Sequence, residues 1–315
     1  MKLEDIKVDL SPKKVADDST WNKDEWIREN PVDYFKYMAI LLQAKEGGVM
    51  TEVFKNLYKV SRLYLPKVLY KYYSISNDEE LNNKKLKTIE SKKLFMSDIK
   101  DFNDPFDGKG FYYRPEQLAD IERISDCNGR LIDDFCKYVK CTSLTSNGVH
   151  SMPMWAHYGS NHTGFCVSYD MENPNNIELR SGAFPVQYID ERIDITTYMK
   201  RFALNISSAI DVQSAVGKKE ILLDDVSILY MMLLFINLKH VTWSYEKEFR
   251  CTIPSNAPGA PFIKATPKEI FIGMDCDLEY EKKLKLLANT IGIRVYKMHF
   301  DELADAYELT PVSIG

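Results

Sequence analysis

The chain has 315 residues, of which 45% are hydrophobic and 28% are charged, an ordinary composition for a protein that folds around a buried core. This length allows one large domain or two smaller ones. The formal net charge of -5 argues against a protein that is held to nucleic acid by bulk electrostatic attraction, although a local basic groove is compatible with it.

The spacing of cysteine and histidine gives no metal site. The six cysteines are scattered without a CxxC pair, and no histidine stands at ligand spacing from them. We therefore predict no bound metal, and reduced thiols as in a cytoplasmic protein. The N-terminus is charged and lacks the apolar region of a signal peptide. The most apolar run, Val226 to Leu238, is shorter than the ~20 residues that cross a bilayer, so it predicts a buried helix and no membrane segment.

The first 66 residues are predicted to form an N-terminal helical cap. Apolar residues recur at helical spacing over residues 31–46 and 51–64, and Pro66 ends the pattern. These helices offer a surface for a protein partner. We expect residues 67–315 to form a separate α+β domain.

Beyond residue 67, β-prone and helical segments alternate irregularly. The β-prone runs lie at 68–73, 94–97, 139–144, 165–169, 270–272 and 293–296, and helical patterns lie at 115–138 and 279–290. This order predicts an α+β fold in which a mixed, mostly antiparallel split sheet carries flanking helices.

The segment from Lys239 to Arg250 concentrates charge in a β-prone run. As a strand, it would point Glu246, Glu248 and Arg250 to one face and its aromatic side chains to the other, because strand side chains alternate. Two carboxylates and a guanidinium on one face of a half-buried strand are unusual unless that face lines a cleft. We therefore predict a cleft beside the two glutamates, with Arg250 as a further binding group.

From residue 68 onward, about three quarters of the chain resembles a widespread bacterial family of unknown function. The motifs that carry this resemblance are LYKY at 69–72, LFMSD at 94–98, FNDPFD at 102–107, WAHY at 155–158, HTGFC at 162–166, WSYEKEFR at 243–250 and IFIG at 270–273. The family has no established activity, so the resemblance implies a grouping and no function.

The order of polar motifs also resembles that of mono-ADP-ribosyltransferase-like enzymes, in which a late Glu-x-Glu holds the nicotinamide ribose of NAD. The resemblance implies that Glu248 stabilises the ribosyl cation and that Glu246 positions the acceptor. It also implies a functional residue on an early strand, here Lys71, which would meet phosphate, or Tyr72. The polar middle strand would be Cys141-Thr142-Ser143 with Thr145-Ser146. A carboxylate near the ribose stabilises the positive charge that develops as the bond to nicotinamide breaks.

The glutamates also have a purely structural interpretation. Glu-x-Glu is a common surface pattern, and Glu246 or Glu248 would then pair with Arg250 or Lys239 across a sheet.

A run of aromatic and histidine side chains over residues 154–164 leads into a predicted strand, where loops hold binding groups on a rigid frame. His157 or His162 would act as a general base or bind phosphate, and Trp155 or Tyr158 would stack on nicotinamide or a base. In the alternative interpretation, Trp155 fills the core and the histidines cap a helical turn.

The loop at 102–107 is rich in acceptor groups. Asn103 and Asp104 would bind a divalent ion or ribose hydroxyls, whereas the alternative is an Asx turn that its own backbone hydrogen bonds fix. The chain has neither GxGxxG nor GxxxxGKS/T, which disfavours Rossmann dehydrogenases and P-loop NTPases.

Together these observations predict a cytoplasmic enzyme that cleaves NAD and transfers ADP-ribose to a macromolecular acceptor, a protein or a nucleic acid. Such an enzyme would act as a bacterial toxin or a phage-defence effector. Two alternatives stay open. One is a nuclease, or another phosphodiester enzyme, with His157 or His162 as acid or base beside Glu248. The other is a non-catalytic module that binds a nucleotide or a protein.

Overall fold

The computed structural model describes residues 22–36, 47–121, 135–217, 236–303, 305 and 307–315. The chain divides into two compact units, and each is described by itself. Unit 1 comprises residues 1–64, 102–137 and 187–241, and unit 2 comprises residues 65–101, 138–186 and 242–315. Residues 1–64 of the segment predicted as a helical cap, residues 1–66, therefore share a unit with two later parts of the chain. The predicted boundary between residues 66 and 67 stays a prediction.

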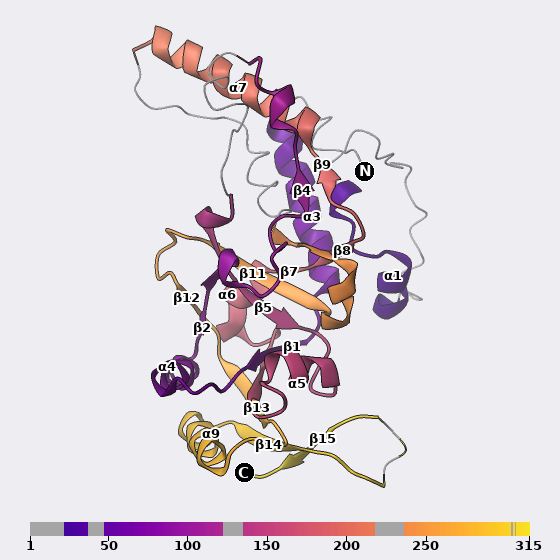
Figure 1. Ribbon diagram of the computed structural model, residues 1–315, viewed down its shortest axis with the longest axis vertical. Helices are drawn as coiled ribbons and strands as arrows, with labels where there is room; N and C mark the ends of the chain where they lie inside the picture. The colour runs from indigo at the N-terminus through magenta and orange to yellow at the C-terminus, as the bar shows by residue number, and fades with distance from the viewer. Residues whose placement is uncertain (1–21, 37–46, 122–134, 218–235, 304, 306) are drawn as a thin grey trace. The chain divides into compact units, whose positions relative to one another are not determined.

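In its described part, unit 1 combines helices with two short pairs of parallel strands (Figure 1). The helical elements are α1 (Lys23–Glu29), α3 (Gly47–Tyr64), η4 (Pro115–Gln117) and α7 (Thr196–Ala215). The strand pairs are β4 (Phe111–Tyr112) with β9 (Ile193–Asp194), and β8 (Gln187–Ile189) with β10 (Leu238–His240). Helix α3 confirms the helix predicted over 51–64. The helix predicted from Val226 lies outside the described residues up to residue 235, and Leu238 begins a strand.

A hydrophobic core holds unit 1 together. Helix α7 buries Tyr198, Met199 and Phe202, which recur at helical spacing and therefore share one face. They belong to one buried cluster with Leu57 of α3 and Leu238 of β10. Among the helices that the structure describes, none is long and apolar enough to cross a membrane.

Unit 2 is built on a sheet of nine strands in the order β15-β14-β13-β6-β1-β5-β11-β7, with β3 also paired to β5. The strands are β1 (Val68–Tyr73), β3 (Ser97–Asp98), β5 (Val139–Thr145), β6 (Phe165–Asp170), β7 (Ala183–Pro185), β11 (Glu248–Pro254), β13 (Pro267–Ile272), β14 (Arg294–His299) and β15 (Thr310–Ser313). The β13–β14 pair is parallel and the other pairs of this sheet are antiparallel. A separate pair joins β2 (Lys93–Phe95) to β12 (Phe262–Lys264). The predicted α+β class with a mixed, mostly antiparallel sheet is confirmed.

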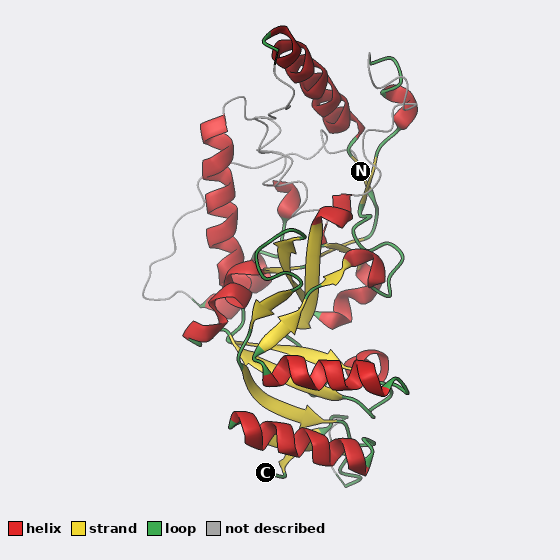
Figure 2. Ribbon diagram, turned by 90° about the vertical axis from the view of Figure 1, so that its left-hand side faces the viewer, coloured by secondary structure: helices red, strands yellow, loops and turns green. Residues whose placement is uncertain are grey.

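Helices flank this sheet, as Figure 2 shows with helices in red and strands in yellow. They are α4 (Glu79–Glu90), α5 (Met152–Tyr158), α6 (Ile177–Gly182) and α9 (Leu278–Ile291), with the 3-10 turns η3 (Ile99–Asp101) and η7 (Pro174–Asn176). Local sequence fixes the ends of α9: the Asp277 side chain accepts from the Glu279 amide, and Gly292 takes the left-handed conformation that ends the helix. Helix α9 supplies the crossover that the parallel β13–β14 pair requires.

The sheet is split on one edge of β5. Strand β1 registers with β5 at a single pair, Tyr70 with Thr145, whereas β3 registers with β5 at Cys141 and Lys140. Residues 142–144 of β5 therefore lie between these two partners on that edge. The gap lets side chains enter the sheet beside the middle of β5.

The segment from Lys239 to Arg250 is not one continuous strand, so the predicted alternation over its first half is wrong. A 3-10 helix, η8 (Val241–Glu246), precedes β11, and Lys247 between them has a φ of 44°. Thr145 and Asn147 hold this helix by donating from their side chains to the carbonyls of Glu246 and Tyr245. Because these partners come from a distant part of the chain, local alternation could not reveal the break.

Candidate functional site

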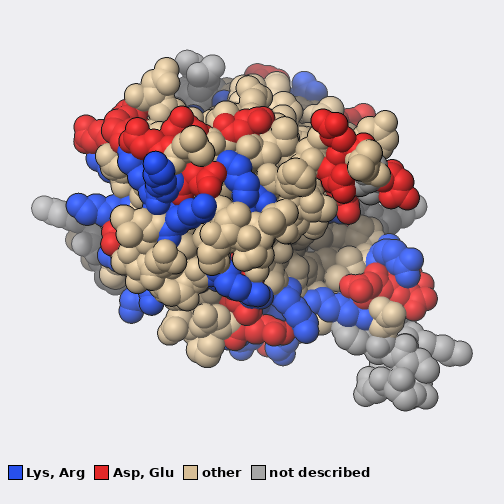
Figure 3. All heavy atoms as spheres, turned by 90° about the horizontal axis from the view of Figure 1, so that it is seen from below, with Lys and Arg blue, Asp and Glu red and all other residues tan. Residues whose placement is uncertain are grey.

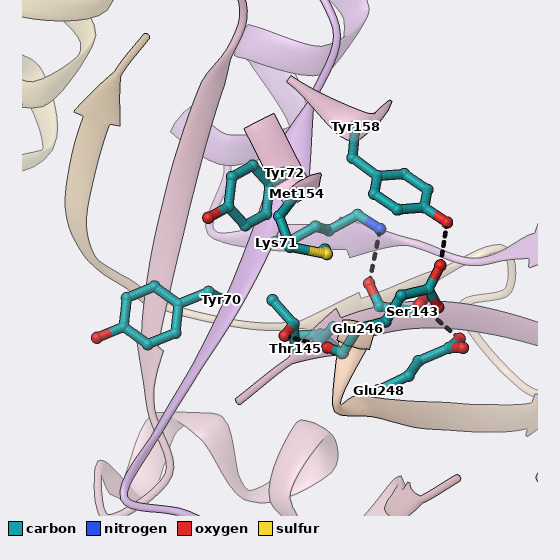
Figure 4. A pocket seen from close by; sticks show the side chains of 10 residues that line it. Tyr70, Lys71, Tyr72, Ser143, Thr145, Met154, Tyr158, Glu246 and Glu248 are labelled. Atoms are coloured by element: carbon teal, nitrogen blue, oxygen red, sulfur yellow. Dashed lines mark hydrogen bonds between the residues drawn. The ribbon is translucent and has the colours of Figure 1, made fainter. Parts of the chain in front are cut away.

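A cavity of about 90 Å³ lies in unit 2 where β1 and β5 separate (Figure 4). It is lined by Tyr70, Lys71, Tyr72, Ser143, Leu144, Thr145, Met154, Tyr158, Glu246 and Glu248. These residues come from β1, β5, α5, η8 and the start of β11, elements that are widely separated in sequence. The cavity thus brings together the early basic residue, the polar middle strand and the two late glutamates.

Glu248 is fixed by a dense set of donors. Its Oε1 atom accepts from Ser143 Oγ at 2.6 Å and from Arg250 Nε at 2.6 Å, and its Oε2 atom accepts from Arg250 Nη2 at 3.1 Å. The register of β11 on β5 sets Arg250 opposite Ser143, which places all three side chains on one face. Glu248 is 3% exposed and Arg250 is fully buried, so this is an enclosed ion pair. Its three donors hold the carboxylate in one orientation.

Glu246 stands at the end of η8, and a different strand and helix hold it. The Tyr158 hydroxyl, from α5, donates a short hydrogen bond to Glu246 Oε1, and the Glu246 carbonyl accepts from Thr145 Oγ1. The residue is 3% exposed. Both glutamates are therefore buried residues that line the cavity.

Lys71 enters the cavity through the split in the sheet. Its Nζ atom donates to the Ser143 carbonyl at 3.2 Å, on the stretch of β5 that lies between β1 and β3, and it lies 5.7 Å from the Tyr73 ring centroid. Burial lowers the pKa of Lys71 to about 8, while the nearby Cys141 and Glu248 act in the opposite direction. This lysine therefore carries a partly titrated amine near neutral pH.

Aromatic side chains complete the lining. Tyr72 donates from its hydroxyl to the Gly148 carbonyl at 2.8 Å and packs edge-on against Trp155 at 5.0 Å between ring centroids. Burial raises the pKa of Tyr72, which keeps its hydroxyl protonated. Tyr70 meets Phe271 with ring centroids 6.2 Å apart. The cavity thus has apolar walls on one side and carboxylates on the other.

Residues 154–251 match the family model described as "Protein of unknown function (DUF2971)". Over this segment the chain is similar to that family. The WAHY, HTGFC and WSYEKEFR motifs lie inside the match, whereas the LYKY and FNDPFD motifs lie outside it. No curated protein and no solved structure gives a significant match.

The DUF2971 segment supplies Met154, Tyr158, Glu246 and Glu248 to the cavity. Four of its predicted site residues are not among the lining residues: Trp155, His157, His162 and Arg250. Trp155 is fully buried, and its indole donates to the Val149 carbonyl at 2.8 Å, so it stands in the core behind Tyr72. This is the core role that the sequence left open as an alternative.

The two histidines of the DUF2971 segment are not among the lining residues. His157 is exposed and lies near the rings of Tyr158 and Tyr245. His162 follows two residues with positive φ and has a φ of 68° itself, and its ring stacks on Trp155 at 6.4 Å between centroids. The structure therefore does not bring either imidazole to the glutamates as part of the cavity wall.

Asn103 and Asp104 belong to unit 1, outside the DUF2971 segment and the cavity lining. Asp104 Oδ1 accepts from the Phe106 amide at 2.9 Å, which is the Asx turn of the alternative interpretation. Asn103 is exposed. Among the described residues, no group of three or more His, Cys, Asp or Glu side chains is placed to hold a metal ion.

The roles of two lining residues, Met154 and Tyr158, were not predicted from the sequence. Met154 was not singled out, and Tyr158 was considered for ring stacking and not as a partner of Glu246. The spacing from Trp155 to Tyr158 on one helical turn was the available signal, since a helix with a buried Trp155 places residue 158 on a neighbouring part of the same face.

Proposed function

We propose that this protein cleaves NAD at the bond between nicotinamide and ribose and passes ADP-ribose to an acceptor. The observation that carries the proposal is the enclosure of Glu246 and Glu248 in one cavity with Ser143 and Lys71. An early basic residue, a polar middle strand and a late Glu-x-Glu around a split sheet are the parts that the resemblance to ADP-ribosyltransferase-like enzymes implied.

The chemistry fits a fixed carboxylate. As the nicotinamide leaves with the bonding electron pair, the ribose carbon becomes an oxocarbenium-like centre. A carboxylate that Ser143 and Arg250 already orient needs little reorganisation to stabilise that charge. Glu248 therefore takes the role of cation stabiliser. Glu246, with the Tyr158 hydroxyl on its Oε1 atom, is left to position the acceptor and take its proton.

The size of the cavity limits what enters it. At about 90 Å³ it is far below the ~300–1,000 Å³ of pockets that enclose a drug-sized ligand. We therefore expect the nicotinamide end of NAD to enter it only in part, between the carboxylates and the tyrosines, with the rest of the molecule outside. Lys71 would then bind either the phosphate next to the ribose or the hydroxyls of the ribose.

The nuclease alternative finds less support, because neither His157 nor His162 lines the cavity that contains Glu248. A non-catalytic nucleotide-binding module would use the same lining, and turnover separates it from the enzyme. A macromolecular acceptor, a cytoplasmic location and a role as a toxin or phage-defence effector belong to this proposal.

Release of nicotinamide from NAD by the intact protein tests the proposal. Glu248→Gln removes the charge and keeps the shape, and we expect it to lower the rate by at least about 100-fold. The matched control is Glu269→Gln: Glu269, on β13 of the same sheet, also pairs with an arginine, Arg294 at 2.5 Å, but does not line the cavity. The control should keep its rate.

Glu248→Gln also weakens a buried ion pair, so the folding of each variant must be checked by its thermal unfolding. Ser143→Ala gives a second reading, because it removes one hydrogen bond to Glu248 and leaves the ion pair with Arg250 in place. The proposal fails if the folded wild-type protein releases no nicotinamide, or if Glu248→Gln and Glu269→Gln lower the rate equally.

A further inference from the structure

Lys71 shares a cavity with two carboxylates but pairs with neither. Among the described residues, no carboxylate oxygen lies within ion-pair distance of its Nζ atom, and its hydrogen bond goes to the Ser143 carbonyl. The reason lies in the other donors: Arg250 and Ser143 engage Glu248, and Tyr158 engages Glu246. In the part of the chain that the structure describes, the amine is therefore held at the cavity without an ion-pair partner, and Glu248 acts on it only from a longer distance.

Two other half-buried lysines of unit 2 have carboxylate partners, whereas the half-buried Lys85 donates to the carbonyl and hydroxyl of Ser74. Lys140, on β5, lies 2.7 Å from Asp98 with 22% of its side chain exposed, and Lys297 lies 3.0 Å from Glu281 with the same exposure. An adjacent carboxylate holds an ammonium in its charged form. Lys140 therefore serves as an internal standard for a lysine of similar burial whose charge is matched.

Burial favours the neutral form of the Lys71 amine over the charged form, because no ion pair among the described residues offsets the loss of solvent. With its pKa lowered to about 8, roughly a fifth of this amine is neutral at pH 7.4, against about one part in a thousand for an ordinary lysine. Only the neutral form has the lone pair that attacks a carbonyl carbon. The groups that face it are Glu248 and Cys141 on the neighbouring strands, Tyr73 on its own strand, and Glu246 with Tyr158 in the cavity wall.

We propose that Lys71 is a nucleophilic amine that forms an imine with a small aldehyde inside this cavity. The inference goes beyond the proposed function, and it holds or fails whether or not NAD is cleaved. A cavity of about 90 Å³ favours aldehydes of a few carbon atoms, or the aldehyde end of an open-chain sugar.

The reaction needs no oxidant or reductant. The Nζ lone pair forms a bond to the carbonyl carbon, the C=O pair moves to oxygen, and that oxygen takes one proton from nitrogen to give a carbinolamine. The second nitrogen proton then leaves with the hydroxyl as water while the C=N bond forms. Glu246 and the Tyr158 hydroxyl line the same cavity and are placed to carry these protons.

The test uses the intact wild-type protein with propionaldehyde and cyanoborohydride, which reduces the imine to a stable secondary amine. Peptide mass mapping compares the labelling rates of Lys71 and Lys140 in the same sample. We expect Lys71 to be labelled on the order of 100-fold faster than Lys140 at pH 7.4. Its rate should level off above pH 8. Equal rates for the two lysines, or a Lys71 rate that still rises steeply above pH 9, overturn the proposal.

A variant tests the proton transfer separately. Glu246→Gln should slow labelling of Lys71 on the order of 100-fold and leave Lys140 unchanged. If the variant labels Lys71 at the wild-type rate while Lys140 behaves as before, Glu246 has no part in the reaction. Nicotinamide release is a separate assay, so a protein that labels at Lys71 but leaves NAD intact supports this inference and contradicts only the proposed function.

Discussion

Arg250 has no exposed surface, and its guanidinium lies against Glu248 in the same β11 strand. Burying both charges costs desolvation free energy, and apolar side chains of similar volume would stabilise the sheet at least as well. The pair therefore contributes orientation more than stability: it holds a carboxylate fixed at the wall of a cavity. That cost is the physical sign that Glu248 serves more than packing.

Removing Arg250 takes a buried guanidinium away from the buried carboxylate of Glu248. We predict that Arg250→Met lowers the free energy of unfolding by about 3–5 kcal/mol. Arg294→Met is the matched control, because the Arg294–Glu269 pair has an arginine that is 66% exposed, and its loss should cost below about 1 kcal/mol. Urea unfolding measures both. Similar losses in the two variants would mean that the Arg250 pair is not enclosed.

The lowered pKa of Lys71 predicts a pH dependence of stability. Below pH 8 the amine is charged in both the folded and the unfolded protein, and burial of that charge opposes folding. Between pH 8 and about 10.4 the unfolded chain binds more protons at this site than the folded protein, so stability rises with pH. We therefore predict that wild type gains stability relative to Lys71→Met between pH 7 and 9.5. A constant difference between the two unfolding free energies would contradict this.

At the scale of the elements, strand β5 and the residues that follow it show which features of the fold can be predicted from the sequence and which cannot. Its β-prone run predicts the strand, and the strands β1, β6, β13 and β14 fall where alternation and β-branched or aromatic residues place them. The break at Lys247 depends instead on Thr145 and Asn147, whose side chains hold η8 from across the fold. Contacts of this kind leave no periodic trace in the sequence.

The turn between α5 and β6 depends on two glycines that meet backbone directly. A Cβ atom on Gly164 would stand 2.2 Å from the Tyr73 carbonyl oxygen, and one on Gly273 would stand 2.1 Å from the His162 carbonyl oxygen. These close approaches join the ends of β1, β6 and β13 beside helix α5, and α5 carries Tyr158. The backbone packing around Gly164 and Gly273 thus positions helix α5 and, with it, the part of the cavity wall that Tyr158 forms.

We predict that Gly273→Ala costs about 3 kcal/mol or more of unfolding free energy, because backbone atoms cannot yield to the added carbon. The control is Gly292→Ala, at the end of α9, where a Cβ meets nothing within 4 Å and the strain of a φ of 73° costs about 1 kcal/mol. Thermal unfolding compares the two. A smaller loss at Gly273 than at Gly292 would contradict the close approach.

At the scale of the whole molecule, each unit is assembled from three separate stretches of the chain. The sequence predicted one break near residue 66, because local patterns show where helices end and not which distant segments pack together. The DUF2971 match, residues 154–251, spans parts of both units. On the face that Figure 3 shows, basic and acidic side chains lie beside one another over much of the surface, in keeping with a net charge of -5.

The central proposal is that NAD binds beside the buried glutamates, Glu246 and Glu248. Hydrogen–deuterium exchange of the intact protein, with and without saturating NAD, tests this most directly. We predict that NAD slows exchange in the segments that line the cavity, residues 68–73, 139–145, 152–158 and 246–250, and leaves α9 unchanged. Unchanged exchange in all four segments, or protection confined to other parts of the chain, would contradict the account.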